Sequence, residues 1–185
     1  MPDELLALAA EAGECTHCSL HQSRTHVVFG MGAPNAELMF IGEGPGAEED
    51  KQGLPFVGRS GKLLDKLILE EIGVTRDRCY IANVVKCRPP RNRDPKPDEI
   101  ASCRPYLEQQ IELIRPHVIV TLGNFSSKLL LDTDTGITKL RGRSYEYGGA
   151  VLIPTFHPSA ALRGGAEPLA KMRSDLVRAK LALAA

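Results

Sequence analysis

The chain has 185 residues, 43% hydrophobic and 25% charged, which suits one compact α/β domain over residues 1–185 and is too short for two good ones. Its 23 basic and 23 acidic side chains cancel, so overall charge does not indicate a nucleic-acid partner, and any basic binding face must be local. No apolar run approaches the length of a membrane span, and residues 1–4 lack the basic start of a signal peptide, so a cytoplasmic protein is expected.

Apolar residues along the chain fall either into short continuous runs or into stripes at helical spacing. The runs predict buried strands and the stripes predict helices, with Ser60 as a helix cap. In chain order we expect a helix at 5–12, a strand at 37–42, a helix at 60–72, a strand at 80–85, a helix at 100–114, a strand at 118–123, a helix at 124–131, a strand at 151–156 and a helix at 168–183. Such alternation of apolar strands with helices is typical of a parallel sheet covered on both faces. The predicted fold is therefore a three-layer α/β/α arrangement around a central, mostly parallel four-stranded sheet.

Four of the five cysteines indicate a metal centre. Cys15 and Cys18 form a Cys-x2-Cys pair before the first strand, whereas a redox dithiol of that spacing normally lies between a strand and a helix. Cys87 and Cys103 follow, although Cys103 also lies on the apolar stripe of its helix and could simply pack in the core. Cys79, beside an apolar strand, is expected to be a buried, inert thiol. Four thiolates can hold zinc or a [4Fe–4S] cluster, and the spacing leaves both open.

Polar side chains stand where predicted strands end. Glu43 follows the first strand, Asn83 lies near the end of the second, and His157 follows the last. Because ligands of parallel α/β sheets bind at the carboxyl ends of the strands, we expect these side chains to converge. A lone histidine is usually structural, but this position favours a functional role, such as donating a hydrogen bond to an oxygen that gains charge.

A glycine-rich turn, Gly-Glu-Gly-Pro-Gly at 42–46, follows the first strand. It does not meet the dinucleotide pattern Gly-x-Gly-x-x-Gly, Pro45 lacks a backbone donor, and no phosphate-loop lysine follows. Nucleotide binding is therefore disfavoured. The simpler interpretation is a tight turn followed by surface acids, namely Glu48, Glu49 and Asp50.

The segment 86–97 is rich in proline and arginine. Five cations lie in eleven residues of it: Lys86, Arg88, Arg91, Arg93 and Lys96. A solvated loop is the plainer interpretation. A loop that contacts DNA phosphates is the sharper one, because non-specific DNA binding needs only a local patch.

Together these segments resemble the family 4 uracil-DNA glycosylases, the iron–sulfur members of that superfamily. The resemblance covers nearly the whole chain, from Cys15 to the last helix. Besides the four cysteines, it rests on Gly42-Glu43-Gly44-Pro45-Gly46-x-x-Glu49-Asp50, Leu54-Pro55-Phe56-Val57-Gly58-x-x-Gly61, Asn83, and His157-Pro158-Ser159-Ala160-Ala161-Leu162-Arg163.

The resemblance implies a monofunctional DNA-repair enzyme. It would flip uracil out of single- or double-stranded DNA and hydrolyse the N-glycosidic bond, starting base-excision repair. It also implies that the metal centre is one structural [4Fe–4S] cluster, which resolves the choice between zinc and iron. A monomer associated with the nucleoid is expected, with a sliding clamp as a candidate partner. The alternatives are a non-catalytic damaged-DNA binding module on the same fold and a zinc-stabilised nucleotide-binding protein.

The resemblance also implies a uracil pocket. Phe56 would stack on uracil, and Asn83 would pair its amide with uracil O4 and N3–H, a pattern that cytosine reverses. His157 would donate a hydrogen bond to uracil O2 as the base leaves, an interaction typically worth about 3–4 kcal/mol of barrier. Backbone amides of Glu43 and Gly44 would complete the pocket floor.

The group that activates water stays open. Family 1 uracil glycosylases place an aspartate in the first motif, and this chain has Gly44 there, as family 4 members generally do. Glu43 is the nearest carboxylate and the favoured base. Glu49 is the second candidate, with blocking of the thymine methyl as its other role.

The resemblance places the segment 159–163 in the minor groove as the base flips. Ser159 would contact DNA, Leu162 would be the wedge, and Arg163 would hold a phosphate. We expect this segment to be a loop, and a leucine in a loop could also be a small satellite of the core. Arg88 and Arg91 of the basic segment would add contacts to DNA phosphates.

Overall fold

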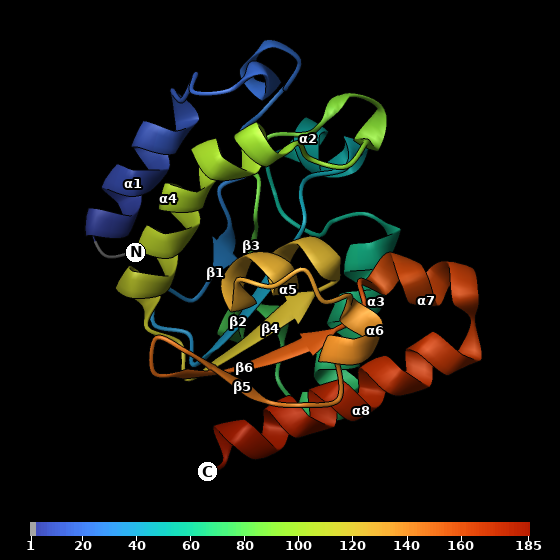
Figure 1. Cartoon of the computed structure of the whole chain (residues 1–185). Helices are drawn as coiled ribbons and strands as arrows, with labels where there is room; N and C mark the ends of the chain where they lie inside the picture. Colours follow the sequence, from blue (N-terminus) through green and yellow to red (C-terminus); the bar gives the residue numbers. More distant parts are fainter. Residues whose placement is uncertain (1–2) are drawn as a thin grey trace.

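The computed structural model describes residues 3–185 and has a six-stranded sheet at its centre (Figure 1). The strands are β1 (Met31–Gly32), β2 (Leu38–Gly42), β3 (Tyr80–Asn83), β4 (Val118–Leu122), β5 (Tyr145–Tyr147) and β6 (Ala150–Thr155). Their spatial order is β1-β3-β2-β4-β6-β5. The inner strands β3, β2, β4 and β6 are parallel, and the edge strands β1 and β5 run antiparallel to their neighbours.

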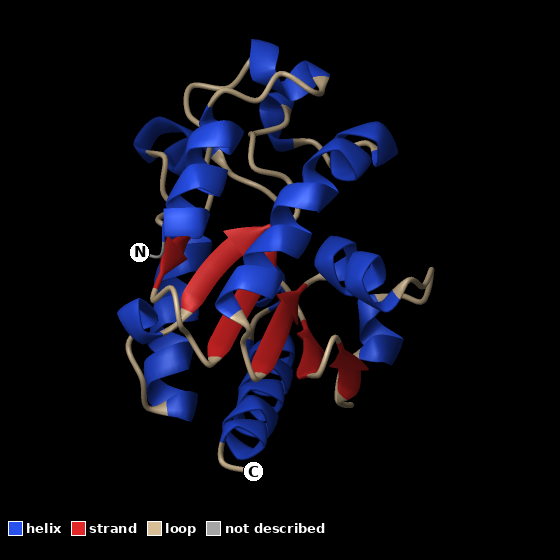
Figure 2. Cartoon of the chain, turned by 90° about the vertical axis from the view of Figure 1, so that its left-hand side faces the viewer, coloured by secondary structure: helices blue, strands red, loops and turns tan. Residues whose placement is uncertain are grey.

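Helices cover this sheet (Figure 2). They are α1 (Asp3–Gly13), α2 (Ala47–Gln52), α3 (Arg59–Leu67), α4 (Pro97–Ile114), α5 (Asn124–Leu131), α6 (Ile137–Leu140), α7 (Pro158–Gly164) and α8 (Ala166–Leu183). A π-helical turn, Ile68–Ile72, extends α3. Within residues 3–185, no helix combines the length and the low charge that crossing a bilayer requires.

Successive side chains of the inner strands point to opposite faces and build two cores. From β2, Met39 and Ile41 join the core under α1, α4 and α5. Leu38 and Phe40 join the core under α3 and α8. Each of these four side chains is at most 3% exposed, so each contributes about 1.5–3 kcal/mol of burial free energy to holding the helices on the sheet. The predicted three-layer α/β/α fold is confirmed.

The sheet is nevertheless larger than the predicted four strands. All four parallel strands are present, but the prediction missed both antiparallel edges. β1 and β5 span only two and three residues, which is too short to leave an apolar run or a clear alternation in the sequence. β5 forms a hairpin with β6 through Gly148 and Gly149, both at positive φ.

Two local predictions were also wrong. Gly58, not Ser60, is the N-cap residue of α3, and no side chain caps that helix start. The segment 159–163, expected as a loop, lies in α7. Pro158 suits the first turn of that helix because its φ is already helical, and the side chain of His157 accepts a hydrogen bond from the first turn.

The topology sets the position of the site. From β2 the chain passes to β3 on one side, and from β3 it crosses back to β4 on the other side of β2. α3 lies on one face of the sheet and α4 on the other, so the two connections diverge at the carboxyl ends of the strands. Open α/β sheets bind their ligands at such a point.

Candidate active site and cysteine cluster

The strand-end residues converge on one small volume. A Cβ added to Gly42 would lie 2.5 Å from Asn83 Oδ1 and 2.6 Å from Phe56 Cζ. The ring centroids of Phe56 and His157 are 5.7 Å apart. Gly42 ends β2, Asn83 ends β3 and His157 follows β6, so three parallel strands and the loop carrying Phe56 build this site.

The side chain of Asn83 is held in an unusual state for a buried amide. The residue is 1% exposed, and its Oδ1 has no hydrogen-bond partner within residues 3–185. A buried acceptor without a partner costs about 1–3 kcal/mol, and most buried polar atoms in proteins avoid that cost. Oδ1 therefore presents an acceptor to a ligand that brings a donor.

His157 is neutral and has a defined tautomer. The backbone N–H of Ser159 donates to its Nδ1 at 3.2 Å, and the Ser159 hydroxyl lies 2.8 Å from the same atom. Because a backbone N–H can only donate, Nδ1 accepts, and the proton of the neutral ring lies on Nε2. Burial lowers the pKa of His157 to about 4, and the nearby Arg163 adds to that effect. Nε2–H is thus a neutral donor at physiological pH.

Glu43 is the half-buried carboxylate of the turn after β2. Burial, with a smaller effect of Asp94, raises the pKa of Glu43 to about 7. Its carbonyl accepts from the backbone N–H of Val85 at 3.1 Å, which ties the turn to the segment after β3. Gly44 is also close to that segment, since an added Cβ would lie 2.7 Å from Val85 Cγ2.

The acids after the turn are not simple surface acids. Glu49 Oε1 accepts from the backbone N–H groups of Val57 and Gly58, each at 2.9 Å. Asp50 is 5% exposed, and its Oδ1 accepts from the backbone N–H of Thr25 at 2.8 Å. Of the three acids, only Glu48 is exposed, as a surface acid should be.

The four predicted cysteine ligands lie in one region. Cys87 and Cys103 are buried in the core that includes α1 and α4, and Cys15 and Cys18 pack against it. Burial raises the pKa of Cys18, Cys87 and Cys103, and neighbouring thiols of the set add to each shift. Cys79 is a separate thiol that is fully buried elsewhere, and burial raises its pKa to about 12, as expected of an inert side chain.

No three His, Cys, Asp or Glu side chains within residues 3–185 stand close enough to hold a single metal ion. A tetrahedral zinc ion needs its sulfurs about 2.3 Å from one centre. In a [4Fe–4S] cluster each thiolate binds a different iron, so the sulfurs lie further apart. The four cysteine side chains gathered in this region match the donor set of such a cluster, one thiolate for each iron.

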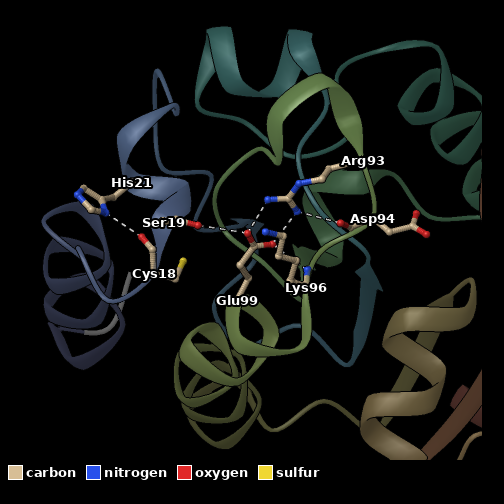
Figure 3. A network of polar contacts seen from close by, with 7 residues as sticks. All are labelled: Cys18, Ser19, His21, Arg93, Asp94, Lys96 and Glu99. Atoms are coloured by element: carbon tan, nitrogen blue, oxygen red, sulfur yellow. Dashed lines mark hydrogen bonds and ion pairs between the residues drawn. The ribbon is translucent and has the colours of Figure 1, made fainter.

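Two networks hold the cysteine segments independently of any metal. Arg24 donates to the carbonyl of Cys15 at 2.7 Å and approaches Cys87 Sγ at 3.5 Å. Figure 3 shows the second network, centred on Glu99 of α4. This fully buried carboxylate accepts from both terminal nitrogens of Arg93, at 2.6 and 2.9 Å, and from Ser19 Oγ at 3.5 Å. The pairing with Arg93 lowers the pKa of Glu99.

The cations of the segment 86–97 do not form one solvated patch. Lys86 is buried and donates to the carbonyl of Asn83 at 2.8 Å, and Arg93 is paired with Glu99. Arg91 is exposed, and Arg88 is half-buried with its Nε donating to Asn92 Oδ1. Lys96 is exposed as well, so the cations that remain for contact with DNA are Arg88, Arg91 and Lys96, along with exposed residues of α7.

α7 carries the predicted wedge and phosphate contact. Leu162 is 41% exposed, although the preceding Ala161 is buried. Arg163 is also exposed. Both residues lie in the helix that begins directly after His157, within two helical turns of it. A side chain inserted from α7 would therefore reach DNA next to the strand-end site. Leu162 is not a satellite of the core.

This fold and site are those of a known class. The family model of the uracil DNA glycosylase superfamily matches residues 29–179. A type-4 uracil-DNA glycosylase of Sulfurisphaera tokodaii is 49% identical over 168 residues, covering 86% of this chain and 76% of the relative. One of Thermotoga maritima is 48% identical over 182 residues, covering 96% and 94%. One of Archaeoglobus fulgidus is 45% identical over 163 residues, covering 84% and 81%. The chain belongs to the type-4 uracil-DNA glycosylases, and the predicted family is confirmed.

Several residues that shape the site were missed from the sequence. Arg24 and Arg76 make contacts with distant segments and leave no local signal. Glu99 was missed too, although it does leave a local signal. It lies three residues after Lys96, in the spacing of a capping box, and its Oε2 accepts from the Lys96 backbone N–H at 2.8 Å.

Proposed function

We propose that this chain hydrolyses the N-glycosidic bond of uracil in DNA, leaving an abasic site in an intact strand. The observation that carries the proposal is the buried Oδ1 of Asn83, which has no partner within residues 3–185 and lies beside the ring of Phe56. It offers an acceptor next to an aromatic face, which is what a flipped uracil requires. The names of the similar type-4 proteins support the same activity.

Base recognition would use Asn83 and Phe56. Uracil N3–H would donate to Oδ1, whereas cytosine N3 carries a lone pair and would leave that atom unpaired. An unpaired buried group costs about 1–3 kcal/mol, so the site would disfavour cytosine. The contact of Glu49 with Val57 and Gly58 supports a role in holding the Phe56 loop, beside its proposed contact with the base.

Bond cleavage would use His157 and Glu43. The neutral Nε2–H of His157 would donate to uracil O2 as negative charge develops there. A neutral imidazole provides this donor without the free-energy cost of burying a charged imidazolium. Glu43, with its pKa raised to about 7, would accept a proton from the attacking water. The backbone amides of Glu43 and Gly44 would border the base.

DNA binding would use α7 and the exposed part of the basic segment. Leu162 would fill the space that the flipped nucleotide leaves, and Arg163, Arg88 and Arg91 would contact phosphates. Ser159 would act mainly through its contacts with His157 Nδ1, with DNA as a second partner. We expect a monomer that acts on single- and double-stranded DNA in the nucleoid, with a sliding clamp as a candidate partner.

We further propose that four cysteines hold one structural [4Fe–4S] cluster. When bound, the cluster would cross-link the segment before β1 to the loop and helix after β3. Thiolates are the ligands that iron–sulfur clusters require, and the guanidinium of Arg24 beside Cys87 Sγ suits sulfurs that carry negative charge. The ligands are Cys15, Cys18, Cys87 and Cys103.

The activity is tested on an oligonucleotide with one uracil, single-stranded or opposite guanine. We expect breakage only after alkali, which reports an abasic site without backbone nicking. Tight binding with no abasic product would favour the damaged-DNA binding module and refute the proposal. His157→Gln should lower the single-turnover rate by about 10²–10³-fold. His117→Gln, an exposed histidine before β4, is the matched control and should leave the rate unchanged.

A further inference from the structure

Phe56 has an unusual backbone conformation for a buried aromatic residue. Its φ is +52°, in the left-handed region, and the residue is 5% exposed. A bulky residue enters this region only when its surroundings enforce it, and such strain gathers at functional sites. The ring that borders Asn83 therefore depends on whatever fixes the backbone of its loop.

One side of this loop is held by Arg76, which lies 20 residues further along the chain. Its Nη1 donates to the carbonyl of Phe56 at 2.9 Å, and its Nη2 donates to the carbonyl of Pro55 at 2.7 Å. The same guanidinium donates to Asp65 Oδ2 of α3 at 3.2 Å. Two adjacent carbonyls and a carboxylate thus fix the planar group of Arg76 in one orientation.

The other side of the loop is closed by Glu49 and Gly61. Glu49 accepts the next two backbone N–H groups, as described above. At Gly61 an added Cβ would lie 1.8 Å from the carbonyl oxygen of Phe56, so α3 approaches that carbonyl too closely for any side chain. The carbonyls of the loop are held by Arg76 and its next two amides by Glu49, so its backbone has little conformational freedom.

We propose that Arg76 is a positioning residue for the base pocket. By fixing the carbonyls of Pro55 and Phe56, it holds the ring of Phe56 against Asn83 and next to His157. Arg76 contacts the backbone carbonyls of the loop and not the ring of Phe56 or the side chain of Asn83. It would therefore act on the substrate only through the position of Phe56. The inference rests on the proposed stacking of uracil on Phe56.

A double-mutant cycle tests this. Arg76→Met keeps the stem and removes the donors, and we expect a fall of about 10–100-fold in the maximal single-turnover rate on uracil DNA. The DNA concentration at half-maximal rate should change less than twofold. In a Phe56→Ala background, Arg76→Met should have little further effect. Arg78→Met, in the same turn but exposed, should be neutral in both backgrounds.

An undiminished rate in Arg76→Met would overturn the inference. An equal loss in the Phe56→Ala background would also overturn it, because a general loss of structure would act whether or not the ring is present. If Arg76→Met does not fold, Asp65→Asn weakens the hold on the guanidinium without removing it, and the same non-additivity with Phe56→Ala is required.

A readout without catalysis separates this inference from the proposed function. The chain has no tryptophan, so Phe56→Trp introduces a single tryptophan, at the site itself. Arg76→Met should increase quenching of this tryptophan by acrylamide, and Arg78→Met should not. Unchanged quenching overturns the positioning role, whereas an inactive wild-type chain with the expected quenching overturns only the proposed activity.

Discussion

Replacing Gly42 by alanine should fill the base pocket without straining the backbone. Gly42 does not adopt a positive φ, so alanine fits its conformation. The new methyl group would lie 2.5 Å from Asn83 Oδ1 and 2.6 Å from Phe56 Cζ, whereas ordinary contacts begin at 3.4 Å. The ring and the amide must therefore retreat by about 1 Å, and a misplacement of that size typically costs about 10²-fold in rate.

The stability cost should be smaller than the catalytic one. Overpacking by one methyl group costs about 1–3 kcal/mol, against a total stability of about 5–15 kcal/mol for a domain. Gly42→Ala should thus remain folded by circular dichroism while its single-turnover rate on uracil DNA falls about 100-fold. Gly13→Ala is the control, because nothing lies within 4 Å of its added Cβ. A wild-type rate for Gly42→Ala would refute the assignment of this volume to the base.

The remaining predictions concern single side chains. Asn83→Leu should keep or raise the melting temperature, because the lost Oδ1 has no partner within residues 3–185. The rate of uracil excision should fall about 5- to 150-fold. A loss of stability like that of other buried amides would contradict this. Because burial raises the pKa of Glu43 to about 7, the single-turnover rate should rise with pH through about 7, and Glu43→Gln should flatten the profile; a profile that keeps its shape would exclude Glu43 as the base. Burial lowers the pKa of His157 from 6.5 to about 4, so between these pH values the unfolded chain binds more protons than the folded one. The melting temperature should therefore fall as pH drops from 6.5 toward 4, and it should fall less in His157→Gln. Arg24→Met should weaken iron retention about 10-fold or more in competition with a chelator, followed by iron content and visible absorbance; equal retention would show that its contact with Cys87 is incidental.

Local patterns in the sequence were sufficient for the layers of the fold. Buried strands and amphipathic helices have apolar residues at characteristic spacings along the sequence. The four parallel strands and the helix at Asn124–Leu131 were therefore predictable. The rule that ligands bind at strand ends then pointed to Glu43, Asn83 and His157, and cysteine spacing pointed to one thiol cluster. Short strands such as β1 carry too few residues for any periodicity, and they were missed.

The precise shape of the site depends on contacts between segments far apart in the chain. Arg76 reaches the carbonyl of Phe56 from 20 residues away, and Arg24 reaches Cys87 from 63 residues away. Each of these hydrogen bonds is a single contact between distant residues and does not recur at a regular spacing. It therefore leaves no periodic pattern in the sequence. The sequence therefore identifies the candidate residues of the site. Folding brings Gly42, Phe56 and Asn83 within contact and, among residues 3–185, leaves Asn83 Oδ1 without a partner.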